Sequence, residues 1–175
     1  MNGARSIEGE IGEPEEIATE TVEVEYVRKI TIDYDRSRED AIEDGQYDWV
    51  NDKIIKTEFA ENDKEKGKKE VNFKIFSLRK GRSSQSQEAI EQMEQEGYRP
   101  ATLKELLAFG AVNPEFQTEF PVNALGEVVS HPEKEIDCVF EIFSVDGERR
   151  VTFQPLDKKW DRYCRFLGVL KEEKE

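Results

Sequence analysis

Apolar and polar residues alternate along residues 22–33, which predicts a strand with one buried face. Most of its apolar residues are at even-numbered positions, and most of its polar residues are at odd-numbered positions. A second alternating run begins at Val71 and ends near Leu78. Because side chains of a strand alternate between the two faces of a sheet, both runs predict strands that pack on a core from one side.

The middle of the chain changes to a helical period and predicts two helices. The first begins at a capping box over residues 84–87 and ends at Gly97, a residue type that favours helix ends. The second begins at a capping box over residues 102–105 and ends at Asn113. Their apolar stripes are formed by Ala89, Ile90 and Met93, and by Leu103, Leu106 and Leu107.

The remainder of the chain returns to strand patterns. Asp146 and Gly147 predict a tight hairpin, because both residue types tolerate a positive φ. Strands at both ends with two helices between them indicate an α+β fold and not a repeating βαβ sheet. Two helices should therefore pack against an antiparallel sheet built from the N-terminal strand and four C-terminal strands, at residues 122–129, 136–145, 148–154 and 163–170.

Composition divides the chain into three parts. Residues 1–21 are acidic and contain glycine and proline, which predicts a flexible acidic tail. Residues 22–171 should form a single α+β domain, since 175 residues with 36% hydrophobic content suffice for one core. Residues 172–175 are a charged C-terminal end.

The segment after the first strand is polar and rich in turn residues. We expect a short helix within residues 35–52, beginning at Ser37, and two aromatic side chains that anchor the segment, Tyr47 and Trp49. Residues 33–35, Asp-Tyr-Asp, superficially resemble the first motif of haloacid-dehalogenase-type phosphatases and the start of a calcium loop. The end of a strand followed by a polar turn explains them more simply.

Charge narrows the classes of partner. The chain has 40 acidic and 26 basic residues and a formal net charge of −14. This charge opposes direct binding to nucleic acid and to membranes, so a protein partner is expected instead. The charge itself has two interpretations: a well-solvated surface, or mimicry of nucleic acid toward a basic protein. No apolar run approaches the roughly 18 residues of a membrane span, and residues 1–21 lack the apolar core of a signal peptide, which favours the cytoplasm.

Few residues are candidates for catalysis or metal binding. His131 is the single histidine and precedes Pro132 in a polar loop, so we expect neither a histidine metal cluster nor a Ser-His-Asp triad within one chain. Cys138 and Cys164 lack metal-ligand spacing and lie in no nucleophile motif, which favours buried free thiols. We therefore expect no metal and no cofactor, and a binding protein more than an enzyme.

Several short motifs, in order, resemble the C-type lectin-like domain. The first is the two-helix stretch from Ala89 to Glu105, with Met93, Gly97 and Thr102 at characteristic places. Later motifs are Asn123-Ala124-Leu125-Gly126, Asp137-Cys138-Val139, Trp160-Asp161-x-x-Cys164 and the closing segment 166–171. Residues 99–110 also resemble a family of small uncharacterised bacterial proteins, a likeness that implies no function.

The resemblance to C-type lectin-like domains implies that Cys138 and Cys164 lie side by side, reduced in a cytoplasmic setting. A second disulfide of that family would need cysteines at Met93 and near Leu170, and both are absent. The calcium-binding triplet of the family is replaced by Gln154-Pro155-Leu156, so calcium-dependent sugar binding is not expected. The resemblance is thus to calcium-independent modules such as the variable proteins of bacterial retroelements.

Two functions remain open. The first is a binding module that holds a protein or small ligand through loops of its C-terminal sheet. The second is an acidic inhibitor, of the kind carried by mobile elements or phages, that occupies the basic groove of a host protein. For the binding module, aromatic residues and arginines are the preferred candidates because they contribute most to hot spots; these are Arg149, Arg150, Trp160, Tyr163 and Arg165.

Overall fold

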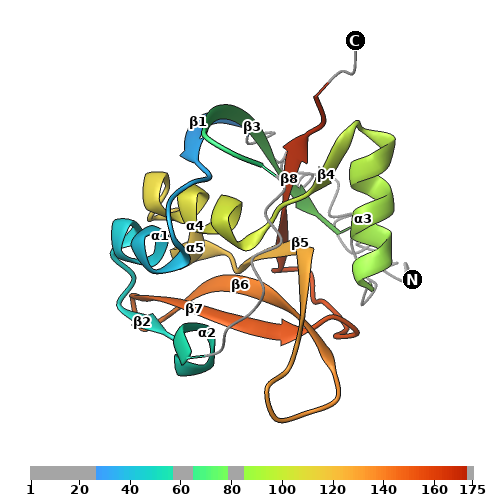
Figure 1. Ribbon diagram of the computed structural model, residues 1–175. Coiled ribbons are helices and arrows are strands. Elements are labelled where there is room, and N and C mark those ends of the chain that lie inside the picture. The colour runs from blue at the N-terminus through green and yellow to red at the C-terminus, as the bar shows by residue number, and fades with distance from the viewer. Residues whose placement is uncertain (1–26, 57–64, 79–84, 173–175) are drawn as a thin grey trace, which may run out of the picture.

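The computed structural model describes residues 27–56, 65–78 and 85–172 (Figure 1). This part of the chain is α+β and contains one mixed sheet of eight strands together with five helices. The strands are β1 (Val27–Asp33), β2 (Trp49–Val50), β3 (Lys68–Ser77), β4 (Tyr98–Pro100), β5 (Val122–Ser130), β6 (Asp137–Val145), β7 (Glu148–Pro155) and β8 (Arg165–Leu170). The helices are α1 (Arg38–Gly45), α2 (Asp52–Lys56), α3 (Ser86–Gln95), α4 (Leu103–Val112) and α5 (Phe116–Glu119). The predicted tail at residues 1–21 and nearly all of the C-terminal end lie outside the described residues.

The sheet has the strand order β1-β3-β8-β5-β6-β7-β2, and β4 also pairs with β8. The expectation of a purely antiparallel sheet is wrong, because β5 pairs with β8 in parallel and β2 pairs with β7 in parallel. A parallel pair needs a long connection between its strands. Neither parallel pair is joined by a hairpin, because β2 and β7 are far apart in the chain and β6 and β7 lie between β5 and β8.

The local signals for turns and helix starts are confirmed in most places. Ser37 caps α1 by accepting a hydrogen bond from the backbone of Asp40. The hairpin between β6 and β7 has positive φ at both turn residues, 50° at Asp146 and 81° at Gly147. The capping box of α4 forms between Thr102 and Glu105 as predicted.

The capping box predicted for α3 begins at residue 84, which lies outside the described residues. The helix begins after Gln85, whose side chain makes no capping hydrogen bond. Ser86 is buried, and its hydroxyl donates to the carbonyl oxygen of Leu156 at 2.6 Å and accepts from Trp160 Nε1 at 2.8 Å. The hydroxyl of Ser86, the first residue of α3, is therefore used in contacts with distant residues and not in capping the helix.

Two apolar clusters lie on opposite faces of the sheet. Phe140 and Ile142 of β6 join the cluster that α4 covers, whereas Val139, at an odd-numbered position, faces the other way and joins the cluster beside α3. Cys138 belongs to the first cluster and Cys164 to the second, and both thiols are free. The two cysteines therefore do not lie side by side as the resemblance implied, and β5 separates β6 from β8 in the sheet.

None of the helices in these ranges is long and apolar enough to cross a membrane. Figure 1 shows α1, α4 and α5 on one side of the molecule and α3 on the other, with β8 between them. The start of β1, the end of α4 and α5 together line a cavity on the side of the molecule away from α3.

Candidate functional site

The four-residue helix α5 is held to the sheet by one buried side chain. Gln117 is only 1% exposed, and its Nε2 donates to the carbonyl oxygens of Phe143 at 2.7 Å and Arg150 at 3.2 Å. These bonds fix one side of the short helix against β6 and β7. The neighbouring residues Glu115 and Glu119 are exposed, so the opposite side of α5 faces outward.

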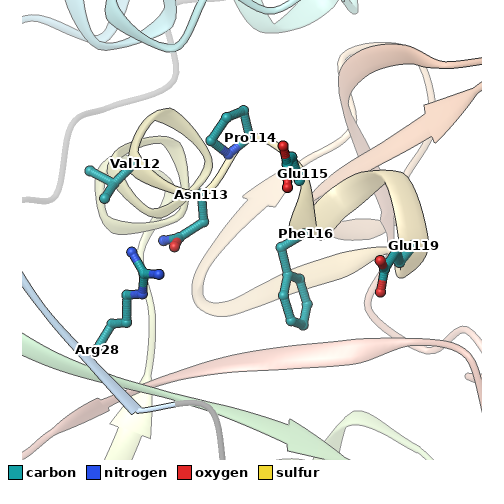
Figure 2. Close-up of a pocket in the computed structure, with 7 residues that line it drawn as sticks. All are labelled: Arg28, Val112, Asn113, Pro114, Glu115, Phe116 and Glu119. Atoms are coloured by element: carbon teal, nitrogen blue, oxygen red, sulfur yellow. The ribbon is translucent and has the colours of Figure 1, made fainter.

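A cavity of about 450 Å³ lies between β1, the end of α4 and α5 (Figure 2). Figure 2 shows Arg28 on one wall, the two glutamates of α5 on the other, and the ring of Phe116 between them. The chemistry of the cavity is therefore mixed, with an aromatic floor and charged rims. Its lining is formed by Arg28, Val112, Asn113, Pro114, Glu115, Phe116 and Glu119.

An edge-to-face contact with Phe109 and a tilted contact with Phe120 hold the ring of Phe116 in place. Its centroid lies 5.6 Å from that of Phe109 and 6.0 Å from that of Phe120. Asn113 supports the same region, since its Nδ2 donates to the carbonyl oxygen of Phe109 at 3.0 Å. Phe109 is fully buried, so the floor of the cavity is continuous with the core and is rigidly positioned.

The two carboxylates on the cavity rim are available for a ligand. Glu115 and Glu119 are four residues apart and so share one face of the helical turn. Within the described ranges, neither carboxylate has a hydrogen bond or an ion pair with another residue. Their like charges repel one another, and a bound cation would relieve that repulsion.

Arg165, at the start of β8, extends this surface beyond the cavity. Its guanidinium lies 4.0 Å from the ring centroid of Phe120 and donates to the carbonyl oxygen of Arg162 at 2.8 Å. Tyr163 is 54% exposed, and its hydroxyl accepts from Arg162 at 2.7 Å. We define the α5 surface as Glu115, Phe116, Glu119, Phe120 and Arg165, with Tyr163 at its margin.

The other predicted arginines lie elsewhere. Arg149 packs over the ring of Tyr47 at 4.6 Å, and its guanidinium donates to the carbonyl oxygens of Gly45 at 2.6 Å and Gly110 at 2.7 Å. It therefore joins α1 to α4. Arg150 lies over Trp49, 5.5 Å from its ring, and pairs with Glu148, while Trp49 itself is 40% exposed and not the core anchor that was expected.

Trp160, expected on the binding face, is instead fully buried. Its ring packs edge-on against Phe166 with centroids 5.4 Å apart, and its Nε1 donates to Ser86. The side chain satisfies its only donor inside the protein and presents no surface to a ligand. Of the five predicted binding residues, Arg165 therefore lies beside α5 through Phe120, and the carbonyl oxygen of Tyr163 accepts from Arg165 at 3.2 Å. The other three lie elsewhere.

Sequence reasoning missed α5 and its glutamates. A signal was present, because the segment between Pro114 and Pro121 repeats Glu-Phe at a spacing of four residues. A spacing of four places side chains on one face of a helical turn. The repeat thus indicated a short helix with one aromatic and one acidic edge.

The titratable groups elsewhere in the fold do not suggest an active site. Burial raises the pKa of Cys138 and raises that of Cys164 to about 12, so neither thiol forms the thiolate that a nucleophile requires. Among the residues that the structure describes, no group of three or more histidine, cysteine, aspartate or glutamate side chains could hold a metal ion. Comparison with protein-family models, with curated proteins and with solved structures finds no match.

Proposed function

We propose that this chain is a binding module that holds a protein partner on the α5 surface. The observation that carries the proposal is a pair of carboxylates, Glu115 and Glu119, that no described residue pairs with, beside a cavity with a rigid aromatic floor. Preformed concave sites with a few convergent polar groups are the usual form of a binding site.

The chemistry of the α5 surface favours a basic side chain of the partner. A lysine or arginine could lay its aliphatic stem on Val112 and Phe116 and place its charged head between the glutamates. The net charge of −14 would also speed the approach of a basic partner and repel acidic ones.

For the fold, we propose a calcium-independent relative of C-type lectin-like domains. Support comes from the position of α3 and α4 between the early strand β3 and the later strands, and from the pairing of β8 with both β3 and β5. Tyr163 then belongs to the loop before β8, and Arg165 begins that strand, at the part of the C-terminal sheet where such a module would hold its ligand. The separation of Cys138 from Cys164 counts against this relation.

The second candidate is an acidic inhibitor that mimics nucleic acid. One observation favours it: α3 exposes Glu88, Glu91 and Glu94 and contains no basic residue. The exposed carboxylates of α1 lie on the opposite side of the molecule (Figure 1), so the two helices do not form one acidic stripe. This function therefore ranks second.

The test is capture of proteins from a lysate of the host cells by the immobilised full chain, compared between matched variants. Glu115→Gln combined with Glu119→Gln should reduce the captured partner about tenfold or more, as expected for hot-spot residues. Arg165→Ala should do the same, whereas Lys53→Ala serves as a control because Lys53 pairs with Glu133 on another part of the surface. Capture that is the same for all variants at low salt and is lost with rising salt would favour the acidic inhibitor. Capture unchanged by the α5 variants would refute the proposal.

A further inference from the structure

Strand β1 has one edge that no strand of the described chain covers. It lies at the end of the sheet order, and its only strand partner there is β3. The backbone N–H of Tyr34 donates to the carbonyl oxygen of Gly67 at 3.0 Å, so these two residues form a hydrogen-bonded pair at the end of the ladder. Because such pairs alternate in an antiparallel ladder, the backbone groups of Thr31 and Lys29 point away from β3.

A second cavity, of about 210 Å³, follows this edge. It touches four consecutive residues of β1, residues 30–33, together with α1 and α4. A cavity on one face of a strand would touch alternate residues only, so this cavity lies along the backbone edge itself. Its helical wall includes three small side chains, Ala41, Ala108 and Ala111, which leave room for a further chain. The larger side chains of that wall are those of Asp44, Lys104 and Val112.

The two cavities are neighbours and share one lining residue. Val112, which is 51% exposed, lines both of them, and Arg28 at the start of β1 lines the one at α5. The β1 groove, defined here as these two cavities together, therefore follows the strand from residue 28 to residue 33. An exposed strand edge beside an apolar groove is a template for pairing with another extended chain.

The charges of the β1 groove indicate a basic occupant. Its cations are already engaged: Arg36 pairs with Asp44 at 2.6 Å, Lys104 donates to the carbonyl oxygen of Tyr34 at 3.0 Å, and Arg28 has an interaction partner of its own. The carboxylates of α5 at one end of the groove have no partner within the described ranges. An occupant with a lysine or arginine at that end would complement them.

We infer that the β1 groove binds an extended basic segment of the partner protein, which adds to the sheet as a strand beside β1. This inference rests on the proposed function, because the α5 surface supplies the pocket for the basic side chain. The backbone of the segment pairs with Lys29 and Thr31, and its small apolar side chains pack on the alanines of α1 and α4. A second copy of this chain fits less well, because pairing two β1 edges would bring together two chains that each carry a charge of −14.

The test titrates a seven-residue peptide into the isotope-labelled full chain and follows the backbone amides by nuclear magnetic resonance. The probe alternates valine and threonine, ends in two lysines, and is blocked at both termini. The chemical shifts of the backbone amides of Lys29, Thr31 and Val112 should change as the peptide binds. Methylating alternate backbone nitrogens of the peptide should weaken binding about tenfold, because it removes strand hydrogen bonds. Replacing its lysines with glutamates should weaken binding by at least as much.

Protein variants separate this inference from the proposed function. Thr31→Pro removes an outward N–H that β3 does not use, and proline is tolerated on an edge strand; the control Thr31→Val keeps the N–H. We expect about tenfold weaker binding for T31P and little change for T31V. If T31P binds as well as the wild type while the glutamate variants bind weakly, the strand pairing is refuted and the α5 surface remains. If T31P alone is weak, the α5 pocket is refuted and the strand pairing remains.

Further outcomes also overturn the inference. If T31P does not fold, the peptide with methylated backbone nitrogens provides the test. Equal affinity of the methylated and unmethylated peptides for the wild-type protein would refute strand pairing. Sedimentation that reveals a dimer abolished by T31P would assign the β1 groove to a second copy of the chain. Slow hydrogen exchange at the amides of Lys29 and Thr31 in the free protein would show that the edge is already covered by this chain itself.

Discussion

Replacing Glu105 with glutamine removes the charge at the centre of a buried network while almost preserving shape. The Glu105 side chain is fully buried and accepts two hydrogen bonds from Arg99 at 2.8 Å, one from Tyr34 Oη at 2.6 Å and one from the backbone N–H of Thr102 at 2.9 Å. The network joins α4 to β4 and to the end of β1. It therefore positions two of the elements that line the β1 groove.

The expected cost follows from what glutamine cannot do. Its amide group donates where the carboxylate accepted, so one bond from Arg99 is lost and the guanidinium loses its counter-charge. Removing one partner of a buried ion pair costs about 3–5 kcal/mol. The Arg99 side chain is 33% exposed, so water can solvate it in part. We therefore expect a loss near the lower limit, about 3 kcal/mol of a total stability of about 5–15 kcal/mol.

The stability lost on Glu105→Gln should be larger at neutral pH than in acid. Burial alone would raise the pKa of Glu105, but the bonds from Arg99, Tyr34 and Thr102 outweigh it and hold this pKa below its usual range. A lowered carboxyl pKa contributes stability that is present above the unfolded value, about 4.3, and is lost as pH falls through the folded value. The difference in the free energy of unfolding between wild type and Glu105→Gln should therefore have its largest value at pH 7 and decrease in strong acid.

Urea denaturation followed by circular dichroism at pH 7, and at stepped lower pH, measures this difference. Tyr34→Phe serves as a milder companion, because it removes one hydrogen bond to a charged group and should cost about 1.5–3 kcal/mol. A loss below about 1 kcal/mol for Glu105→Gln would refute the assigned role of the buried pair. A loss that stays constant down to pH 2 would refute its electrostatic origin.

Three further predictions concern other parts of the fold. Burial raises the pKa of Glu141, so its ionisation destabilises the fold as pH rises above about 4.3; Glu141→Gln should stabilise the protein at pH 7 and not at pH 4, by urea denaturation. A Cβ at Gly126 would lie 2.4 Å from the carbonyl oxygen of Pro100, so Gly126→Ala should cost about 1–3 kcal/mol and lower the melting temperature. Cys138 and Cys164 should react with a thiol reagent only after denaturant is added, and rapid reaction of the folded protein would contradict their burial.

The sequence alone determined the features that depend on neighbours a few residues apart. The capping box of α4 needs only Thr102 and Glu105, three positions apart, and the β6–β7 hairpin needs only Asp146 and Gly147. Alternation of apolar residues identified β1 and β3 because burial on one face imposes a period of two. The candidate site was partly accessible in the same way, since Tyr163 and Arg165 were selected by residue type.

Tertiary structure decided everything that depends on long-range pairing. The parallel pair of β5 and β8 leaves no trace in the sequence of either strand, because backbone hydrogen bonds are the same for every side chain. Trp160 is buried, and Cys138 and Cys164 occupy different faces of the sheet, because the register of each strand assigns its side chains to one face. The β1 groove likewise exists only because packing brings α1, α4 and α5 to one strand edge, which no local pattern encodes.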